Sequence, residues 1–246
     1  MQTMILTDLH TLEPHDRPAP GLAQPDDVRL KVERVGVCGS DIHYYNTGRI
    51  GDQVVQFPFV VGHECAATVL ETGDRVQALK AGDRVAVDPA VSCHDCDQCR
   101  KGRYHTCRHL KFLGCPGQLE GCLCEEIVMP AQCCYRIPDS MDFDTAALVE
   151  PLTIGYYAVE LAEPAPGSKV GILGAGPIGL SVLVALRARG IEAVYVTEPL
   201  AYRRDAATAN GAVAGCDPTA ANAADWGAQR EPELLDVVFD CCGKQE

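Results

Sequence analysis

Four cysteines, Cys93, Cys96, Cys99 and Cys107, follow one another at intervals of two, two and seven intervening residues. Four thiolates at this spacing can surround one Zn²⁺ ion as a tetrahedron. A shell of four sulfurs leaves no position for a substrate, so the pattern predicts a structural zinc in a lobe at residues 90–110. An iron–sulfur cluster is the alternative interpretation, but nothing else in the sequence indicates electron transfer.

A second group of polar and metal-ligating side chains is scattered over three segments, GVCGSDIHYY, VVGHEC and ALVEPLT. These segments contain Cys38, Ser40, His43, Tyr44, His63, Glu64 and Glu150. One thiolate, one imidazole and one carboxylate suit a catalytic Zn²⁺ that keeps an open coordination position. Without further information, a single histidine or glutamate in a β domain is usually structural or solvated.

A glycine-rich turn predicts a dinucleotide site. Gly174, Gly176 and Gly179 form a G-x-G-x-x-G pattern that follows an apolar strand and opens a helix. Such glycines let the backbone approach a pyrophosphate, and the free N–H groups of the helix start bind it. Glu198 ends the next strand, where a carboxylate accepts hydrogen bonds from the adenosine ribose and repels a 2′-phosphate. This favours NAD over NADP, although Arg203 and the adjacent Arg204 could hold a 2′-phosphate. The alternative is a glycine turn without a ligand.

The elements that must position these residues differ between the two parts of the chain. Up to about residue 150, short alternating segments such as VRLKVERV (28–35) and DRVAVDP (83–89) predict a β domain of barrel or sandwich type. From residue 167 onward, strands at 170–173, 193–197 and 236–240 alternate with helices, which predicts a parallel α/β sheet. We expect these three strands and the helix that begins at Pro177 to be buried. The segment EPAPGS (163–168) is the expected link between a domain of residues 1–160 and one of residues 161–246.

Composition narrows the classes of protein. The 246 residues carry a net charge of −13, which makes nucleic acid a poor partner. A membrane-spanning run of apolar residues and a signal peptide are both lacking in the sequence, so we expect a cytoplasmic protein. Fourteen cysteines are then expected as thiols or metal ligands, with the nine outside the two groups above filling the core.

Taken together, these motifs make the sequence resemble the zinc-containing medium-chain alcohol dehydrogenases. The resemblance rests on GVCGSDIHYY with GRIGDQVVQFPFVVGHE, on SCHDCDQCRKGRYHTC, on ALVEPLTIG and on GILGAGPIGL…VTE. Within that family the sequence is similar to the sorbitol and xylitol dehydrogenases. The resemblance implies an α/β protein with an N-terminal GroES-like β domain and a Rossmann domain. It also implies an NAD-linked oxidation of a polyol to a ketose, and a homo-oligomer, either a tetramer or a dimer.

The resemblance also implies roles for individual residues. Catalytic zinc would be held by Cys38, His63 and Glu64, with Glu150 beside the metal. Ser40 and His43 would pass the alcohol proton toward solvent, and Tyr44 would line the polyol pocket together with Glu150. A structural zinc would be bound by Cys93, Cys96, Cys99 and Cys107. NAD would be contacted by Gly174, Gly176, Ile178, Gly179, Glu198 and Arg203, with Thr153 near the nicotinamide.

The family sequence continues well beyond DVVFDCCGKQE, the last segment of this chain. We therefore expect the Rossmann domain to lack its C-terminal part, and a chain of this length to bind zinc with little turnover. Two alternatives remain open. One is an L-threonine or other secondary-alcohol dehydrogenase, and the other is a non-catalytic zinc- and nucleotide-binding protein.

Overall fold

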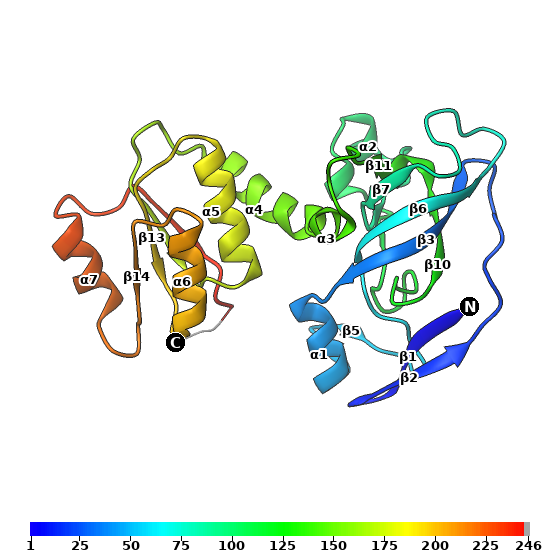
Figure 1. Ribbon diagram of the computed structural model, residues 1–246, viewed down its shortest axis with the longest axis horizontal. Coiled ribbons are helices and arrows are strands. Elements are labelled where there is room, and N and C mark those ends of the chain that lie inside the picture. The colour runs from blue at the N-terminus through cyan, green and yellow to red at the C-terminus, as the bar shows by residue number, and fades with distance from the viewer. Residues whose placement is uncertain (244–246) are drawn as a thin grey trace. The chain divides into compact units, whose positions relative to one another are not determined.

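The computed structural model describes residues 1–243. Contacts between these residues divide the chain into two compact units, Met1–Glu150 and a second unit that begins at Pro151. Figure 1 draws the first unit in blue to green and the second in yellow-green to red. The division by contacts falls ten residues before the expected limit at residue 160. The reason is that helix α4 (Val149–Ala162) packs Val159 into the core of the second unit.

The first unit is built around a five-stranded antiparallel sheet with the strand order β10-β3-β6-β7-β11. Its strands are β3 (Asp27–Gly36), β6 (Glu64–Thr72), β7 (Arg84–Val87), β10 (Glu126–Pro130) and β11 (Cys134–Arg136). Val28 and Leu30 of β3 are fully buried, and Leu30 pairs with Val69 of β6. Because side chains alternate along a strand, one face of the sheet closes over an apolar core, as the sequence predicts.

Short elements surround this sheet and carry most of the candidate site residues. The strands among them are β1 (Gln2–Asp8), β2 (Thr11–Asp16), β4 (Arg49–Ile50), β5 (Gln53–Val54), β8 (Ala90–Val91) and β9 (Lys111–Phe112). The helices are α1 (Gly39–Thr47), α2 (Asp97–Arg100), η1 (Tyr104–Thr106), η2 (Ala131–Cys133) and α3 (Phe143–Ala147).

The second unit is a four-stranded parallel sheet with the order β14-β13-β12-β15. Its strands are β12 (Val170–Leu173), β13 (Val194–Thr197), β14 (Ala214–Cys216) and β15 (Val237–Asp240). Helices α5 (Pro177–Ala188), α6 (Ala201–Ala209) and α7 (Ala223–Arg230) alternate with them along the chain. The predicted Rossmann-like α/β class is confirmed, and its core is formed by buried residues of β12, β13 and α5.

Two expectations of burial in this unit are wrong in part. Strand β15 was expected to be buried, but Val238 is 52% exposed while Phe239 faces the core. In the part of the sheet that the structure describes, β15 pairs only with β12, so it is an edge strand with one open side. On α5, Val184 likewise keeps 39% of its surface exposed, although the helix is apolar nearly all round.

The nine cysteines expected in the core follow the prediction with exceptions. Six are buried: Cys65, Cys115, Cys122, Cys133, Cys134 and Cys216. Cys124 and Cys241 are only half-buried, and Cys242 is exposed directly after the edge strand β15. All fourteen are free thiols. Among the described residues, no helix is both long and apolar enough to cross a membrane.

Candidate metal and dinucleotide sites

The four cysteines of the first motif converge. We call Cys93, Cys96, Cys99 and Cys107 the four-cysteine group, and their sulfur atoms all lie within 4.8 Å of one another. The chain achieves this with two short helical turns: Cys96 precedes α2, Cys99 lies in it, and Cys107 follows η1. Four of the six sulfur pairs are 3.4 to 4.0 Å apart. Sulfurs on a tetrahedron about 2.3 Å from one ion are about 3.8 Å apart, so the group fits Zn²⁺.

Backbone N–H groups point at these sulfurs. The N–H of Cys96 donates to Cys93 Sγ, that of Arg108 to Cys96 Sγ, and that of His109 to Cys107 Sγ. Such bonds favour the thiolate, and backbone donors from Cys99 and Arg108 lower the pKa of Cys96 to about 6. Burial instead raises the pKa of Cys99 to about 12. A cation is therefore needed to keep all four sulfurs deprotonated at once.

The scattered ligands also converge. We call Cys38, His63 and Glu64 the three-ligand group, and their ligand atoms lie within 4.8 Å of one another. Antiparallel pairing of β3 with β6 sets Gly36 opposite Glu64, which brings the chain just before α1 to the start of β6. A Cβ atom at Gly36 would lie 2.3 Å from Glu64 Oε2, so a larger residue there would displace the carboxylate from the group. A thiol, an imidazole and a carboxylate fit a zinc site with an open position.

Asp41 is a site residue that the sequence did not predict. Its carboxylate is buried, accepts hydrogen bonds at 3.0 Å from the N–H groups of Cys38 and Gly62, and lies 3.7 Å from His63 Nδ1. It therefore fixes the backbone on both sides of the three-ligand group and faces its imidazole. The signal was present in the sequence: an acidic residue three positions after Cys38 completes a capping box at the start of α1.

The charges around the three-ligand group favour a cation. The hydrogen bond with His63 lowers the pKa of the Cys38 thiol, whereas burial raises that of Glu64. Burial lowers the pKa of His63, but the hydrogen bond with Cys38 and the charge of Asp41 outweigh it, so that the net pKa is raised. Burial, opposed by His63 and reinforced by Glu64, raises the pKa of Glu150 to about 7. Several acidic groups thus crowd one buried place, and a dication would relieve their repulsion.

The remaining residues expected near the catalytic metal lie on α1 and α4. Ser40 hydrogen-bonds with Cys38 and helps to lower the pKa of that thiol, while His43 is exposed. Tyr44 is 4% exposed, and its hydroxyl donates to Gln53 Oε1 at 3.0 Å. It therefore belongs to an apolar cluster with Leu6 and Phe59. Thr153 is exposed near the start of α4, and its proximity to nicotinamide stays a prediction.

The glycine turn has the form that the sequence predicts. Gly174 has a φ of +91°, and a Cβ on Gly179 would lie 1.9 Å from the carbonyl oxygen of Gly174. Gly176 precedes α5, with Pro177 at the first helical position and Ile178 half-buried behind it. These glycines let strand and helix approach closely and leave the helix start open to an anion.

Glu198 lies beside this turn. Its buried carboxylate accepts hydrogen bonds at 3.0 Å from the N–H groups of Ala175 and Leu200. The Arg203 guanidinium is 3.8 Å from the same carboxylate and from the Cβ position of Gly176, so it lies over the turn. Arg204 instead donates to the backbone carbonyls of Glu198 and Pro199. Of the two arginines, Arg204 is thus engaged by the backbone, and the carboxylate of Glu198 can accept hydrogen bonds from the hydroxyl groups of an adenosine ribose.

Comparisons with known proteins agree with this geometry. Residues 24–139 match the alcohol dehydrogenase GroES-like domain. The chain is 39% identical over 225 residues to a sorbitol dehydrogenase of Arabidopsis thaliana, covering 89% of this chain and 61% of that protein. It is 35% identical over 248 residues to a probable D-xylulose reductase A of Aspergillus fumigatus, covering 99% of this chain and 69% of the relative. This chain thus spans less than two thirds of the sorbitol dehydrogenase.

A solved structure extends the comparison to the whole fold. A putative zinc-binding dehydrogenase of Sinorhizobium meliloti, crystallised with NADP, superposes with a TM-score of 0.89 at 31% identity. The match covers 99% of this chain and 70% of that one. Both units described above therefore occur together in known dehydrogenases.

Proposed function

The chain belongs to the zinc-containing medium-chain alcohol dehydrogenases, in the branch of the sorbitol dehydrogenases and D-xylulose reductases, and we propose that it serves the oxidation of a polyol such as sorbitol or xylitol. In the proposed reaction a secondary hydroxyl becomes a ketone and NAD⁺ accepts the hydride. One observation carries the proposal: the ligand atoms of Cys38, His63 and Glu64 lie within 4.8 Å of one another. Three ligands would leave the fourth position of a tetrahedral zinc ion for the substrate.

The three-ligand group and the residues around it have different proposed roles at the substrate hydroxyl. A zinc ion held by Cys38, His63 and Glu64 supplies a Lewis acid that lowers the pKa of a hydroxyl group. Asp41 fixes the N–H groups that border this site. Burial raises the pKa of Glu150 to about 7 in the metal-free protein. Beside the metal its carboxylate is proposed to hydrogen-bond the water or hydroxyl group there and to exchange a proton with it. We assign proton transfer toward solvent to Ser40, beside Cys38, and to the exposed His43. Tyr44 is kept as a proposed contact of the polyol.

The glycine turn and Glu198 are proposed to bind NAD. The start of α5 suits the pyrophosphate, because the first N–H groups of a helix have no partner within the helix and carry partial positive charge. The carboxylate of Glu198 suits the ribose hydroxyls and repels a 2′-phosphate. The backbone contacts of Arg204 support NAD over NADP, since that guanidinium is already engaged. Arg203 over the turn is proposed to contact the cofactor, with Thr153 near its nicotinamide.

The four-cysteine group is proposed to hold a second, structural zinc ion. We also propose a cytoplasmic location and a homo-oligomer. The fourteen free thiols support a reducing compartment, while the oligomer rests on the family alone.

The test combines metal analysis with a substrate panel on the protein purified at its native length. We expect two zinc ions per chain and NADH formation with sorbitol or xylitol, at a higher rate than with L-threonine. NADP⁺ should be the poorer acceptor. Removal of zinc by dialysis against a chelator should stop turnover, and Mg²⁺ should not restore it. Two outcomes would contradict the proposal: preferred oxidation of L-threonine, or turnover that persists after zinc is removed.

A further inference from the structure

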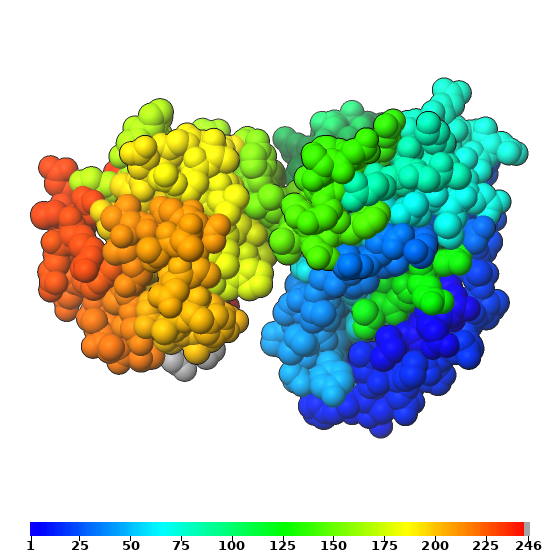
Figure 2. Space-filling view, viewed as in Figure 1, coloured from blue at the N-terminus to red at the C-terminus, as the bar shows by residue number. Residues whose placement is uncertain are grey.

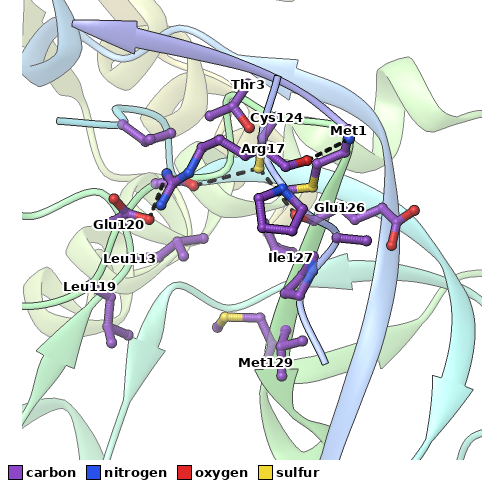
Figure 3. A pocket seen from close by; sticks show the side chains of 16 residues that line it. Met1, Thr3, Arg17, Leu113, Leu119, Glu120, Cys124, Glu126, Ile127 and Met129 are labelled. Carbon is purple, nitrogen blue, oxygen red and sulfur yellow. Dashed lines mark hydrogen bonds and ion pairs between the residues drawn. The ribbon is translucent and has the colours of Figure 1, made fainter. Parts of the chain in front are cut away.

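Strand β10 has one open side. In the part of the chain that the structure describes, it lies at the end of the five-stranded sheet and pairs only with β3. A cleft of about 420 Å³ runs along the open side, between β10 and the segment of residues 17–20. Figure 3 shows the side chains that surround this cleft, and in Figure 2 the green β10 residues reach the surface between blue residues of β1 and β3.

The register of β10 shows which backbone groups face the cleft. Glu125, just before β10, accepts a backbone hydrogen bond from β3, and Ala131, just after β10, donates one to the residue that precedes β3. In an antiparallel pair these bonds recur at every second residue, so Ile127 and Met129 also bond to β3. Val128 lies between them and directs its N–H and C=O to the open side. No partner for either group is found in residues 1–243.

The chain itself does not supply a partner strand. The carbonyl oxygen of Glu126 accepts from the Cys124 thiol at 3.3 Å, and Pro130 has no N–H, so the groups on either side of Val128 are partly used or missing. Across the cleft, residues 17–20 include two prolines, which also have no N–H to donate. The free donor and acceptor of β10 are thus those of one residue at its centre.

A free N–H and C=O on one residue of an edge strand match the backbone of an added strand. In an antiparallel arrangement, one residue of that strand exchanges both hydrogen bonds with Val128. A rise of about 3.3 Å, a strand spacing of about 4.8 Å and a sheet spacing of about 10 Å give each residue about 160 Å³. The cleft of about 420 Å³ therefore holds about three residues of an extended chain.

The alternation of side chains sets the sequence pattern of the added strand. Glu126 and Val128 are half-buried, whereas Ile127 and Met129 are buried and face the core. The residue opposite Val128 lies on the same face as Glu126, and its two neighbours face the cleft. Leu119 is half-buried in the cleft wall, so apolar side chains suit these two neighbours.

The charges favour a basic residue at the centre. Arg29 pairs with both Glu126 and Glu71, so two carboxylates share one positive charge on this face of the sheet. The whole chain carries a net charge of −13. A lysine opposite Val128 adds the positive charge that these carboxylates lack.

We propose that the open edge of β10 binds a short extended peptide by antiparallel strand addition. The peptide has a basic residue opposite Val128, with an apolar residue on either side. This interaction surface goes beyond the proposed dehydrogenase activity and does not depend on it.

The probe is a valine–lysine–valine tripeptide, blocked by acetyl and amide groups at its ends. Amide NMR and hydrogen exchange follow the binding. In the peptide-free protein the Val128 amide should exchange faster than those of Ile127 and Met129, because it has no partner, and the peptide should slow it. A peptide with a methyl group on the lysine backbone nitrogen should bind about five-fold more weakly, since one N–H is lost. Glutamate in place of lysine should weaken binding about three-fold.

Two variants separate the backbone from the side chain of Val128. Val128→Pro removes the N–H and places a ring at the open side, so it should abolish binding of the tripeptide. Its melting temperature should change little, because a proline on an edge strand costs no ladder bond when its nitrogen faces the open side. Val128→Thr keeps the N–H and should retain the affinity. The comparison of the two peptides on the wild type does not require either variant to fold.

Three results would overturn the proposal. The first is a Val128 amide that is as protected as that of Ile127 before peptide is added, because another segment or a second copy of the chain would then pair there. The second is an exchange rate of Val128 that the tripeptide leaves unchanged. The third is equal affinity for the peptide with the methylated backbone, which would mean that only side chains make contact.

Discussion

The sulfurs of the four-cysteine group come from one stretch, residues 93–107, whereas the ligands of the three-ligand group come from the end of β3 and the start of β6. Two short helical turns suffice to bring the first set together. The second set requires a correct register between two strands of the main sheet. The local group offers four sulfurs and no vacancy, while the distant group offers three unlike ligands and an open position. Stability and chemistry are thus assigned to different places.

The largest expected effect on turnover comes from removing a ligand of the three-ligand group. Cys38→Ser in the native-length protein should lower turnover by about 1,000-fold or more, because the Lewis acid would be lost. Zinc content should fall from two ions to one per chain. The melting temperature should change little, since Cys38 is only half-buried and precedes a short helix. Activity assays, metal analysis and thermal unfolding measure the three quantities.

The matched change in the four-cysteine group should lower stability more than turnover. Cys99→Ser should also remove one zinc, but its main effect should be a lower melting temperature and faster proteolysis within residues 93–107. The lobe there is held mainly through the sulfurs and few buried side chains. Residual turnover should be measurable at a temperature where the variant stays folded. An unchanged melting temperature together with lost turnover would reverse the assignment of the two groups.

A variant of Asp41 tests whether zinc binding at the three-ligand group depends on the carboxylate that faces His63. Asp41→Asn keeps the size of the side chain and removes the charge that faces His63. We expect zinc affinity at the three-ligand group to fall by about 10- to 100-fold, as for other residues that orient metal ligands. The four-cysteine group should keep its zinc in the single variant Asp41→Asn, which serves as a separate control. Competition with a zinc chelator, followed by metal analysis of Cys99→Ser and of Asp41→Asn/Cys99→Ser, isolates the effect. Equal affinities would show that Asp41 serves only the cap of α1.

The comparison also explains how much could be predicted from the sequence. The four-cysteine spacing and the glycine turn are local patterns. The structure has both, because the residues of each pattern lie close together in the sequence. The three-ligand group is predicted only through the resemblance to a known family. Its ligands lie on separate segments, and the register between β3 and β6 that joins them cannot be read from any short stretch of sequence. Asp41 was missed although its capping box is local, because an acidic residue in a first helical turn is ordinary. Likewise, the exposure of Val238 depends on the neighbours of β15 in the sheet and not on its own apolar sequence.

The smallest expected effect concerns pH. The pKa of Glu150 is about 7 in the folded protein, above the ordinary 4.5, because burial disfavours the charged form. The stability linked to this proton is present below about pH 4.5 and is lost as pH rises through 7. In metal-free protein, Glu150→Gln should therefore remove about 2 kcal/mol of the decline in unfolding free energy between pH 5 and 8. Urea unfolding at both pH values measures this difference.

Zinc provides the matched control for this pH effect. A dication at the three-ligand group should lower the pKa of Glu150, because it stabilises the carboxylate, and the wild type should then lose much of its decline. The raised pKa values of His63 and Glu64 act in the same direction and remain in Glu150→Gln, so part of the decline should persist in the metal-free variant. Equal pH slopes for metal-free wild type and Glu150→Gln would show that Glu150 is already solvated. The three-ligand group would then be more accessible to water than its geometry indicates.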